Sequence, residues 1–264
     1  MPEGDTVFRT ARSLNAALAG EIITVSDIRV PAFATVDLTG RTVDDVVARG
    51  KHLLLHAGDL TVHSHLKMEG AWHLYRHGSS WQRPAFQARI ILETADWVAV
   101  GFELGVLEVV PTIEEHTVVG HLGPDLLGPD WNAEAAETAV ANLVAKPDVP
   151  LAVALADQRN LAGLGNVFVN ELCFLRGIRP QRPMSEVPDA AGIVALAHRL
   201  ITANAERTAR TTTGVDRNGQ RLWVYGRGGK PCRRCGTRIQ HGQLGRTELE
   251  QRETWWCPRC QSEL

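Results

Sequence analysis

Four of the five cysteines are arranged as two Cys-x-x-Cys pairs near the C-terminal end of the chain. Cys232 and Cys235 form the first pair, and Cys257 and Cys260 form the second after 21 intervening residues. In a cytosolic chain, such pairs are typical of metal ligands rather than of disulfides. Four thiolates close a tetrahedral zinc site without an open position, so we expect one structural Zn²⁺. Cys173 lies in an apolar stretch and is expected to be a core residue.

The surroundings of the cysteines favour contact with nucleic acid. Pro231-Cys232-x-x-Cys235 also matches half of the zinc deaminase signature, but none of the ten histidines has a Glu two positions later, as the other half requires. That class of enzyme is therefore excluded. The segment is instead rich in arginine, which binds phosphates in a bidentate manner: Arg233, Arg234, Arg238, Arg246, Arg252 and Arg259.

The N-terminus could carry covalent chemistry. Removal of Met1 would leave Pro2 with a free secondary amine, followed by Glu3. An α-amine has a pKa of about 7.8, against about 10.4 for lysine, so much more of it is unprotonated near neutral pH. A secondary amine condenses with a sugar aldehyde to an iminium ion, and Glu3 could protonate a sugar oxygen. From these two residues alone, an ordinary N-terminus is the simpler interpretation.

Two further segments could bind anions. Lys51 follows Arg49-Gly50 and precedes an apolar run, which could hold its ammonium group partly buried. The glycine-rich stretch 160–166 ends in Asn166, at the start of an expected helix, and helix N-termini bind phosphate. Alone, Lys51 also reads as a surface lysine and the second segment as a simple helical hairpin.

Composition places these segments in a globular, non-membrane chain. The 264 residues suggest two domains, and 44% hydrophobic with 22% charged residues is typical of folded proteins. We see no secretory signal and no apolar run near the 18 residues of a membrane span, so a cytoplasmic protein is expected. The net charge is −2, yet residues 201–264 carry 12 Arg and Lys against 6 Asp and Glu. This asymmetry indicates a localised contact with a polyanion.

Hydrophobic periodicity predicts a β-rich first part and a helical second part. A helix is expected over 5–19, capped by Asp5 and followed by strands separated by turn residues. Eight short strands favour an antiparallel sandwich or barrel: 21–30, 42–49, 52–56, 60–66, 71–75, 86–93, 97–102 and 105–110. Helices are expected at 132–145, 151–158, 166–175 and 189–205, with a loop over 211–230.

Taken in order, four motifs resemble the formamidopyrimidine-DNA glycosylase/endonuclease VIII family of base-excision-repair enzymes, and most closely its endonuclease VIII branch. The resemblance extends from residue 2 to residue 261 and rests on Pro2-Glu3-Gly4, Arg49-Gly50-Lys51-His52-Leu53-Leu54, Gly163-x-Gly165-Asn166-Val-Phe-x-x-Glu171, and Tyr225-Gly-Arg to Cys257-Pro-Arg-Cys260. It implies an α+β protein with three parts. These are an N-terminal antiparallel β-sandwich with a helix (1–112), a helix–two-turn–helix domain (113–222) and a zinc finger (223–264).

By position, the resemblance assigns the catalytic roles. Pro2 would be the Schiff-base nucleophile, and Glu3 would be the acid that opens the deoxyribose ring. Lys51 would contact phosphate and assist elimination. The implied activity is that of a DNA glycosylase and AP lyase that cuts the strand by β,δ-elimination.

The resemblance also assigns DNA contacts. Asn166 would hold a phosphate, and Arg252 would bind the phosphates that flank the lesion. The hairpin around 242–250 is longer than is usual in the family, which leaves Arg246 as a second candidate for the Arg252 role. Met68 would fill the gap left by the flipped base, although its pattern also fits a strand core residue.

The expected substrate is double-stranded DNA with an oxidised base or an abasic site, and single-stranded DNA is a second form; the protein is expected to be a monomer. Members that favour oxidised purines carry an Arg and a Phe in the stretch that corresponds to Phe102-Glu103-Leu104-Gly105, where no arginine stands here. This favours oxidised pyrimidines. Two alternatives remain: a glycosylase of the oxidised-purine branch, and a non-catalytic zinc-finger protein that binds damaged DNA.

Overall fold

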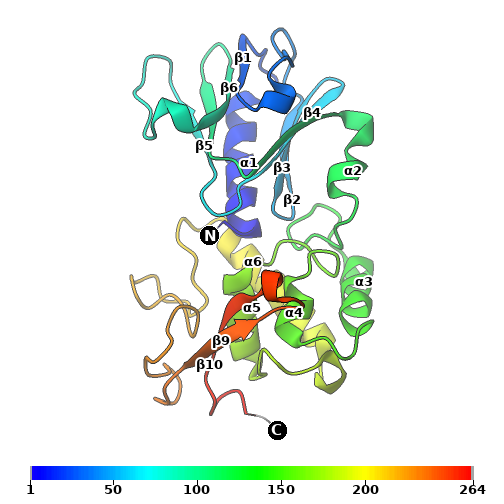
Figure 1. Cartoon of the computed structure of the whole chain (residues 1–264), viewed down its shortest axis with the longest axis vertical. Helices are drawn as coiled ribbons and strands as arrows, with labels where there is room; N and C mark the ends of the chain where they lie inside the picture. Colours follow the sequence, from blue (N-terminus) through cyan, green and yellow to red (C-terminus); the bar gives the residue numbers. More distant parts are fainter. Residues whose placement is uncertain (1, 263–264) are drawn as a thin grey trace. The chain divides into compact units, whose positions relative to one another are not determined.

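The computed structural model describes residues 2–262, which fold as two compact units. The first unit extends to His121 and the second begins at Leu122 (Figure 1). Among the described residues, no helix has the length and apolar character needed to cross a membrane.

The first unit is built on two antiparallel sheets of four strands each. One has the order β1-β6-β7-β5 and the other β2-β3-β4-β8. Their inward faces, with Leu53, Val62, Ile90 and Ala99 among them, form one apolar core, which confirms the predicted sandwich. The strands are β1 (Val25–Ile28), β2 (Asp45–Arg49), β3 (His52–Ala57), β4 (Leu60–His65), β5 (Ala71–Tyr75), β6 (Ala88–Glu93), β7 (Val98–Phe102) and β8 (Val106–Pro111).

Three strands, β1, β2 and β6, start two or more residues later than predicted. Residues 21–23 do not continue β1, because they pair with 41–43 through the Ile22–Thr42 bridge and the Ile23 N–H bond to Arg41 O. This local pairing also delays the start of β2. At β6, the 3₁₀ turn η2 (Ala85–Gln87) occupies the first expected residues. A second 3₁₀ turn, η1 (Pro31–Phe33), follows β1.

Helix α1 (Gly4–Leu18) packs its apolar face, with Val7, Leu14 and Leu18, onto the sandwich core. The prediction that Asp5 caps this helix is wrong. The cap position is Glu3, and Asp5 lies inside the first turn, where its carboxylate accepts from the Thr6 N–H at 2.8 Å. A negative charge in the first turn is still favourable there because it faces the positive end of the helix dipole.

The second unit consists of helices around an apolar core, followed by a two-stranded ribbon. Asn132 and Asp189 accept hydrogen bonds from the first turns of α3 and α6, which confirms the predicted cap of α3. The ribbon pairs β9 with β10 in antiparallel register. The elements are α3 (Ala133–Val144), α4 (Leu151–Ala156), α5 (Asn166–Arg176), η4 (Met184–Glu186), α6 (Ala190–Ala205), β9 (Gln240–Leu244), η5 (Glu248–Glu250) and β10 (Arg252–Trp256).

Residues 112–121 lead out of the sandwich through η3 (Thr112–Glu114) and the short helix α2 (His116–Val119). His56 on β3 holds this segment. Its Nε2 lies 2.6 Å from the carboxylate of Glu115, and its Nδ1 contacts the carboxylate of Asp45 on β2. Burial lowers the pKa of His56, but the hydrogen bonds to both carboxylates outweigh it and raise the pKa above its ordinary value.

This histidine should make the stability of the first unit depend on pH. Because the folded-state pKa is raised, its stabilisation is fully present below the unfolded pKa, near 6.5, and is lost as the pH rises through the folded pKa. We therefore expect His56→Gln to lower the stability at pH 6 and to approach the wild type at pH 9 in chemical denaturation. The control is His116→Gln. His116 is an exposed histidine on α2, in the segment that His56 holds. A deficit of equal size at both pH values would contradict this role.

Candidate functional site

The N-terminal pair lies where α1 begins. Pro2 is half-buried, and Glu3 is fully buried as the residue that precedes the helix. The Glu3 carbonyl accepts from the N–H groups of Thr6 and Val7 at 2.9 and 3.0 Å, whereas its carboxyl group does not cap the helix. The residue directly after Pro2 therefore carries a buried carboxyl group. The removal of Met1, on which a free amine depends, lies outside the described residues.

Lys51 stands at the tip of the β2–β3 hairpin. Arg49 pairs with His52, so Gly50 and Lys51 form a two-residue turn. Gly50 has φ +60°, a left-handed conformation that glycine adopts without strain, and such turns match the twist of the flanking strands. Lys51 is half-buried, which is one of the two states that the sequence left open. A short turn between two paired strands fixes its position more closely than a long loop would.

A cluster of histidines beside Lys51 was not singled out in the sequence. His52 Nδ1 lies 2.7 Å from His63 Nε2, and His63 Nδ1 lies 3.0 Å from a carboxylate oxygen of Glu108. A carboxylate only accepts, so His63 donates from Nδ1 to Glu108. The signal that could have revealed this cluster is strand alternation, because His63 and His65 are two residues apart on β4 and Glu108 pairs with His63.

Two imidazoles of this cluster, those of His52 and His65, have lowered pKa values. Burial, followed by repulsion from the neighbouring histidines and Lys51, lowers the pKa of His52 to about 3. Burial and repulsion from Lys67 and Lys51 lower the pKa of His65 to about 4. Near neutral pH these two rings are therefore uncharged and add no positive charge beside Lys51.

Met68 lies on a turn between β4 and β5 and is 57% exposed, so the alternative of a strand core residue is wrong. The turn is a single loop closed by the Gly70 N–H bond to Leu66 O at 2.9 Å. Such a closed turn points side chains outward and cannot bury Met68 in the sheet.

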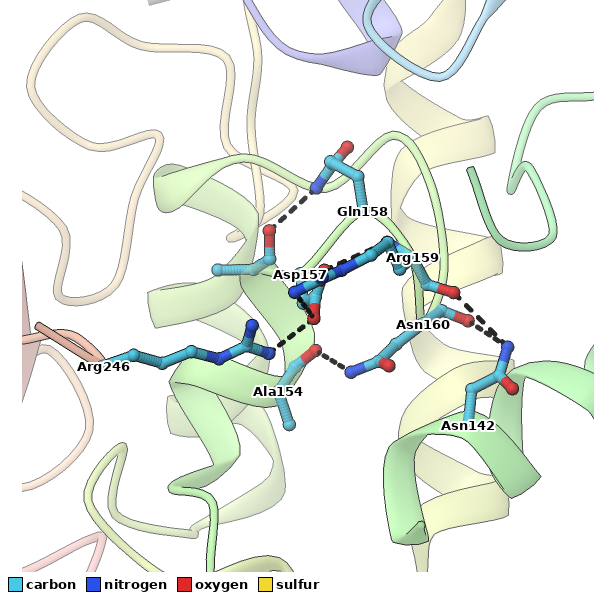
Figure 2. A network of polar contacts seen from close by, with 8 residues as sticks. Asn142, Ala154, Asp157, Gln158, Arg159, Asn160 and Arg246 are labelled. Atoms are coloured by element: carbon cyan, nitrogen blue, oxygen red, sulfur yellow. Dashed lines mark hydrogen bonds and ion pairs between the residues drawn. The ribbon is translucent and has the colours of Figure 1, made fainter. Parts of the chain in front are cut away.

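The two turns of the helix–two-turn–helix motif are held by side chains (Figure 2). Gln158 donates to the carbonyls of Ala156 and Leu164 at 3.0 Å and accepts from the Gly163 N–H at 3.1 Å. Asn160 donates to Ala154 O at 2.8 Å. A segment without regular structure must satisfy its buried backbone groups in this way. These hydrogen bonds fix the conformation of the residues that lead from α4 into α5.

Asn166 and Asn170, one helical turn apart on α5, attach the ribbon to this motif. The Asn166 side-chain amide donates to Glu253 O at 2.8 Å, and the Asn170 side-chain carbonyl accepts from the Trp255 N–H at 2.7 Å. The structure thus brings together two residues that the sequence singled out separately, because Arg252 precedes Glu253 on β10. The hydrogen bond from the buried side-chain amide of Asn166 to Glu253 O holds Asn166 close to Arg252.

Most arginines near the cysteines bind within the protein. Arg246 pairs with Asp157 beside α4 (Figure 2), and Arg233 and Arg238 donate to backbone carbonyls. Although burial raises the pKa of Asp157, hydrogen bonds from Arg159 and Arg246 hold it well below its usual range. Arg252, by contrast, is exposed at the start of β10. Arg246 is exposed as well, but Asp157 engages its guanidinium group, so of the two hairpin arginines Arg252 is the better candidate for a contact with phosphate.

The four sulfur atoms of Cys232, Cys235, Cys257 and Cys260 lie within 4.8 Å of one another. Tetrahedral zinc with Zn–S bonds of about 2.3 Å requires S···S separations of about 3.8 Å, which this cluster fits. All four donors are thiols, so the site is closed and structural. Cys173 is fully buried in the helical core, and burial raises the pKa of its thiol to about 12, as expected for an unreactive core residue.

Glu171 on α5 binds residues 223–225, which precede the first zinc ligands in the chain. Its buried carboxylate accepts from the N–H groups of Trp223, Val224 and Tyr225 at 2.8 to 2.9 Å and from the hydroxyl of Thr212. Burial raises the pKa of Glu171 although these hydrogen bonds oppose it. The loop predicted over 211–230 is thereby held against the helix.

Three family descriptions match nearly the whole chain. The formamidopyrimidine-DNA glycosylase N-terminal domain matches residues 1–103, and the H2TH domain of the same glycosylase matches residues 122–214. The zinc finger found in FPG and IleRS matches residues 229–262. The chain belongs to the formamidopyrimidine-DNA glycosylase family.

Relatives place it in the endonuclease 8 branch. It is 54% identical to the probable endonuclease 8 2 of Streptomyces coelicolor, over 99% of this chain and 94% of that protein. It is 53% identical to the DNA-(apurinic or apyrimidinic site) lyase Nei2 of Mycolicibacterium smegmatis, over 99% of each. The fold matches Lactococcus lactis Fpg, solved in complex with an abasic site containing DNA, with a TM-score of 0.81, 23% identity and 99% and 100% of the two chains covered.

We expect Cys257→Ser to release zinc and to unfold residues near 230–261, because the thiolates replace a hydrophobic core there. Arg252 would be lost from its position with the ribbon, so affinity for DNA should fall while the sandwich stays folded. Zinc content, circular dichroism and fluorescence anisotropy with a DNA duplex measure the three effects. The matched control is Cys173→Ser, which should keep its zinc. Zinc-free protein with unchanged affinity for DNA would contradict this account.

Proposed function

We propose that the protein is a base-excision-repair DNA glycosylase with AP lyase activity that uses Pro2 as its nucleophile. The observation that carries the proposal is the Pro2-Glu3 pair at a buried helix start, in a chain 53% identical along 99% of its length to a relative named as an AP lyase. A non-catalytic DNA-binding protein would have no need for a buried carboxyl group beside the N-terminal amine. Double-stranded DNA is the partner, and the protein acts as a monomer.

In the proposed reaction, the Pro2 amine attacks C1′ of the flipped nucleotide and the damaged base leaves. Glu3 donates a proton to the ring oxygen, which opens the sugar and gives an iminium ion. The iminium accepts the electron pair released when the C2′ proton is removed, and the 3′ phosphate leaves; loss of the 5′ phosphate follows in the second elimination. Lys51, at its hairpin tip, binds a phosphate and assists this step.

The second unit supplies phosphate contacts in this proposal. The Asn166 amide uses one of its two hydrogens for Glu253 O, and the other is available to a phosphate oxygen. Arg252, exposed and next to that bond, contacts the phosphates that flank the lesion. Zinc holds the ribbon that carries Arg252. Met68, exposed on its turn in the first unit, enters the gap left by the flipped base.

The proposed lesions are oxidised pyrimidines and abasic sites, in duplex and in single-stranded DNA. The stretch Phe102–Gly105 has no arginine, and Glu103 adds a negative charge to it. Without an arginine that reads the opposite base, discrimination of about 1–3 kcal/mol is lost, and opposite-base preference is relaxed.

The nucleophile can be tested by trapping. Borohydride should reduce the iminium and link the wild-type protein covalently to abasic-site DNA. Pro2→Gly should reduce trapping, and one extra residue before Pro2 should abolish it because the amine then becomes an amide. The readout is the yield of the cross-linked species on a denaturing gel. Undiminished trapping by the extended protein would move the nucleophile to a lysine, with Lys51→Met as the variant that decides.

Lesion preference can be tested by competition on matched duplexes. We expect higher kcat/KM for thymine glycol and dihydrouracil than for 8-oxoguanine paired with cytosine, and little dependence on the opposite base. A single-stranded oligonucleotide with the same lesion serves as the comparison for strand preference. A clear preference for 8-oxoguanine opposite cytosine would assign the protein to the other branch.

A further inference from the structure

Two turns at one end of the sandwich are strained and joined to each other. Lys67 and Glu103, with φ of +52° and +46°, are the non-glycine residues with left-handed backbone among residues 2–262. The Gly105 N–H donates to His65 O at 3.0 Å, and a side chain at Gly105 would collide with Lys67. Non-glycine residues rarely adopt this conformation, and such strain persists where the surrounding structure fixes it.

Arg83, from the segment between β5 and β6, connects both turns. Its Nη1 donates to Glu69 O at 2.8 Å and pairs with the Glu103 carboxylate at 3.2 Å. A guanidinium group thus stands beside the Met68 turn although the stretch 102–105 has no arginine of its own. The arginine comes from another segment of the chain, so the residues of the stretch 102–105 do not reveal it.

The same segment presents an aromatic ring to solvent. Phe86, on η2, is 78% exposed, and its backbone is held on all sides. Arg89 donates to Phe86 O at 3.2 Å, Arg29 donates to Ala85 O at 3.0 Å, and the Glu103 N–H donates to Gln87 O at 2.9 Å. Hydrogen bonds to three successive carbonyls restrain the backbone while the ring stays free of the core.

We propose that Phe86 stacks on a DNA base beside the lesion and that Arg83 positions the Met68 turn next to it. The proposal rests on the DNA-processing function above and adds a second apolar contact to it. An exposed aromatic ring next to arginines is the combination that binds unstacked bases, because every base offers a π-face whatever its identity. Flipping one nucleotide leaves its neighbours and the opposite base without a stacking partner.

Charge around the ring fits a nucleic acid. Arg29 and Arg89 donate to the carbonyls of Ala85 and Phe86, and Arg83 pairs with Glu103, whose N–H donates to Gln87 O. Asp27 balances the charge of Arg29 and Glu103 that of Arg83, so these five side chains carry one net positive charge. The ring therefore sits among guanidinium groups that are close to a phosphate backbone when a base stacks on it. A stacking contact of this kind also suits single strands, where bases are exposed without flipping.

The test compares Phe86→Ala, Phe86→Leu and Phe86→Trp by anisotropy on a duplex with a tetrahydrofuran abasic analogue and on the intact duplex. Loss of one stacked base should weaken binding to the lesion duplex by roughly 5- to 100-fold in the Ala and Leu variants, with Trp near wild type. Binding to the intact duplex should change little. The matched control is Ile113→Ala, an apolar side chain 87% exposed in the same unit.

2-Aminopurine at the position opposite the abasic analogue, or next to it, reports stacking directly. The wild type and Phe86→Trp should quench its fluorescence, and Phe86→Ala should not. Arg83→Gln should weaken quenching and lesion binding together, whereas Arg83→Lys should restore both in part, because the single nitrogen Nη1 makes both contacts and an ammonium group also has the hydrogens for two of them. Unchanged affinity and quenching in Phe86→Ala would overturn the proposal, as would an equal loss on the intact duplex or in Ile113→Ala.

Borohydride trapping separates this proposal from the function on which it rests. All Phe86 variants keep Pro2 and should still form the cross-link when DNA is saturating. If the wild type forms no cross-link, the lyase assignment fails, yet the affinity ratio of Phe86→Ala to wild type still decides whether the ring contacts DNA.

Discussion

One buried helix has to satisfy the backbone of segments that have no regular structure of their own. Helix α5 is buried along most of its length, yet it carries Asn166, Asn170 and Glu171. Buried polar groups are tolerated only when they are hydrogen-bonded, and these three bind backbone groups of β10 and of residues 223–225. Replacing any of them by an apolar residue would leave backbone groups of another segment unpaired. The zinc-bearing ribbon and Arg252 depend on this arrangement, because about 40 residues around a metal cannot build an extensive core.

The first unit solves a different problem, which is to hold reactive groups at the ends of rigid elements. Pro2 and Glu3 stand at the start of α1, and Lys51 stands in a two-residue turn between paired strands. Each is fixed by a neighbouring element whose apolar face is buried in the sandwich. The histidines beside Lys51 add polarity without charge, because burial keeps them neutral.

Arginine content alone is a poor guide to where DNA binds. The sequence shows a basic C-terminal segment, but in the structure Arg233, Arg238 and Arg246 use their guanidinium groups on carbonyls or on Asp157. In contrast, Arg83 lies far along the chain from the basic C-terminal segment and joins two turns beside Met68. Five donors on one planar group allow an arginine to hold several backbone oxygens at once. Loop-rich domains therefore consume arginines for their own structure.

The sequence by itself predicted the strands of the sandwich, the helices α1 and α3 to α6, the zinc ligands and the family, because each of these depends on local pattern. Strand alternation, the Asn132 cap and the spacing of the four cysteines are properties of short segments. Contacts between distant segments were decided only by tertiary structure. Examples are the hydrogen bond from Asn166 to Glu253, the contacts that link Glu108 to His63 and His63 to His52, and the pairing of Arg83 with Glu103. Their partners are 11 to 87 positions apart in the sequence. No local pattern encodes them, because they exist only once strand register and helix packing have brought their partners within hydrogen-bond distance.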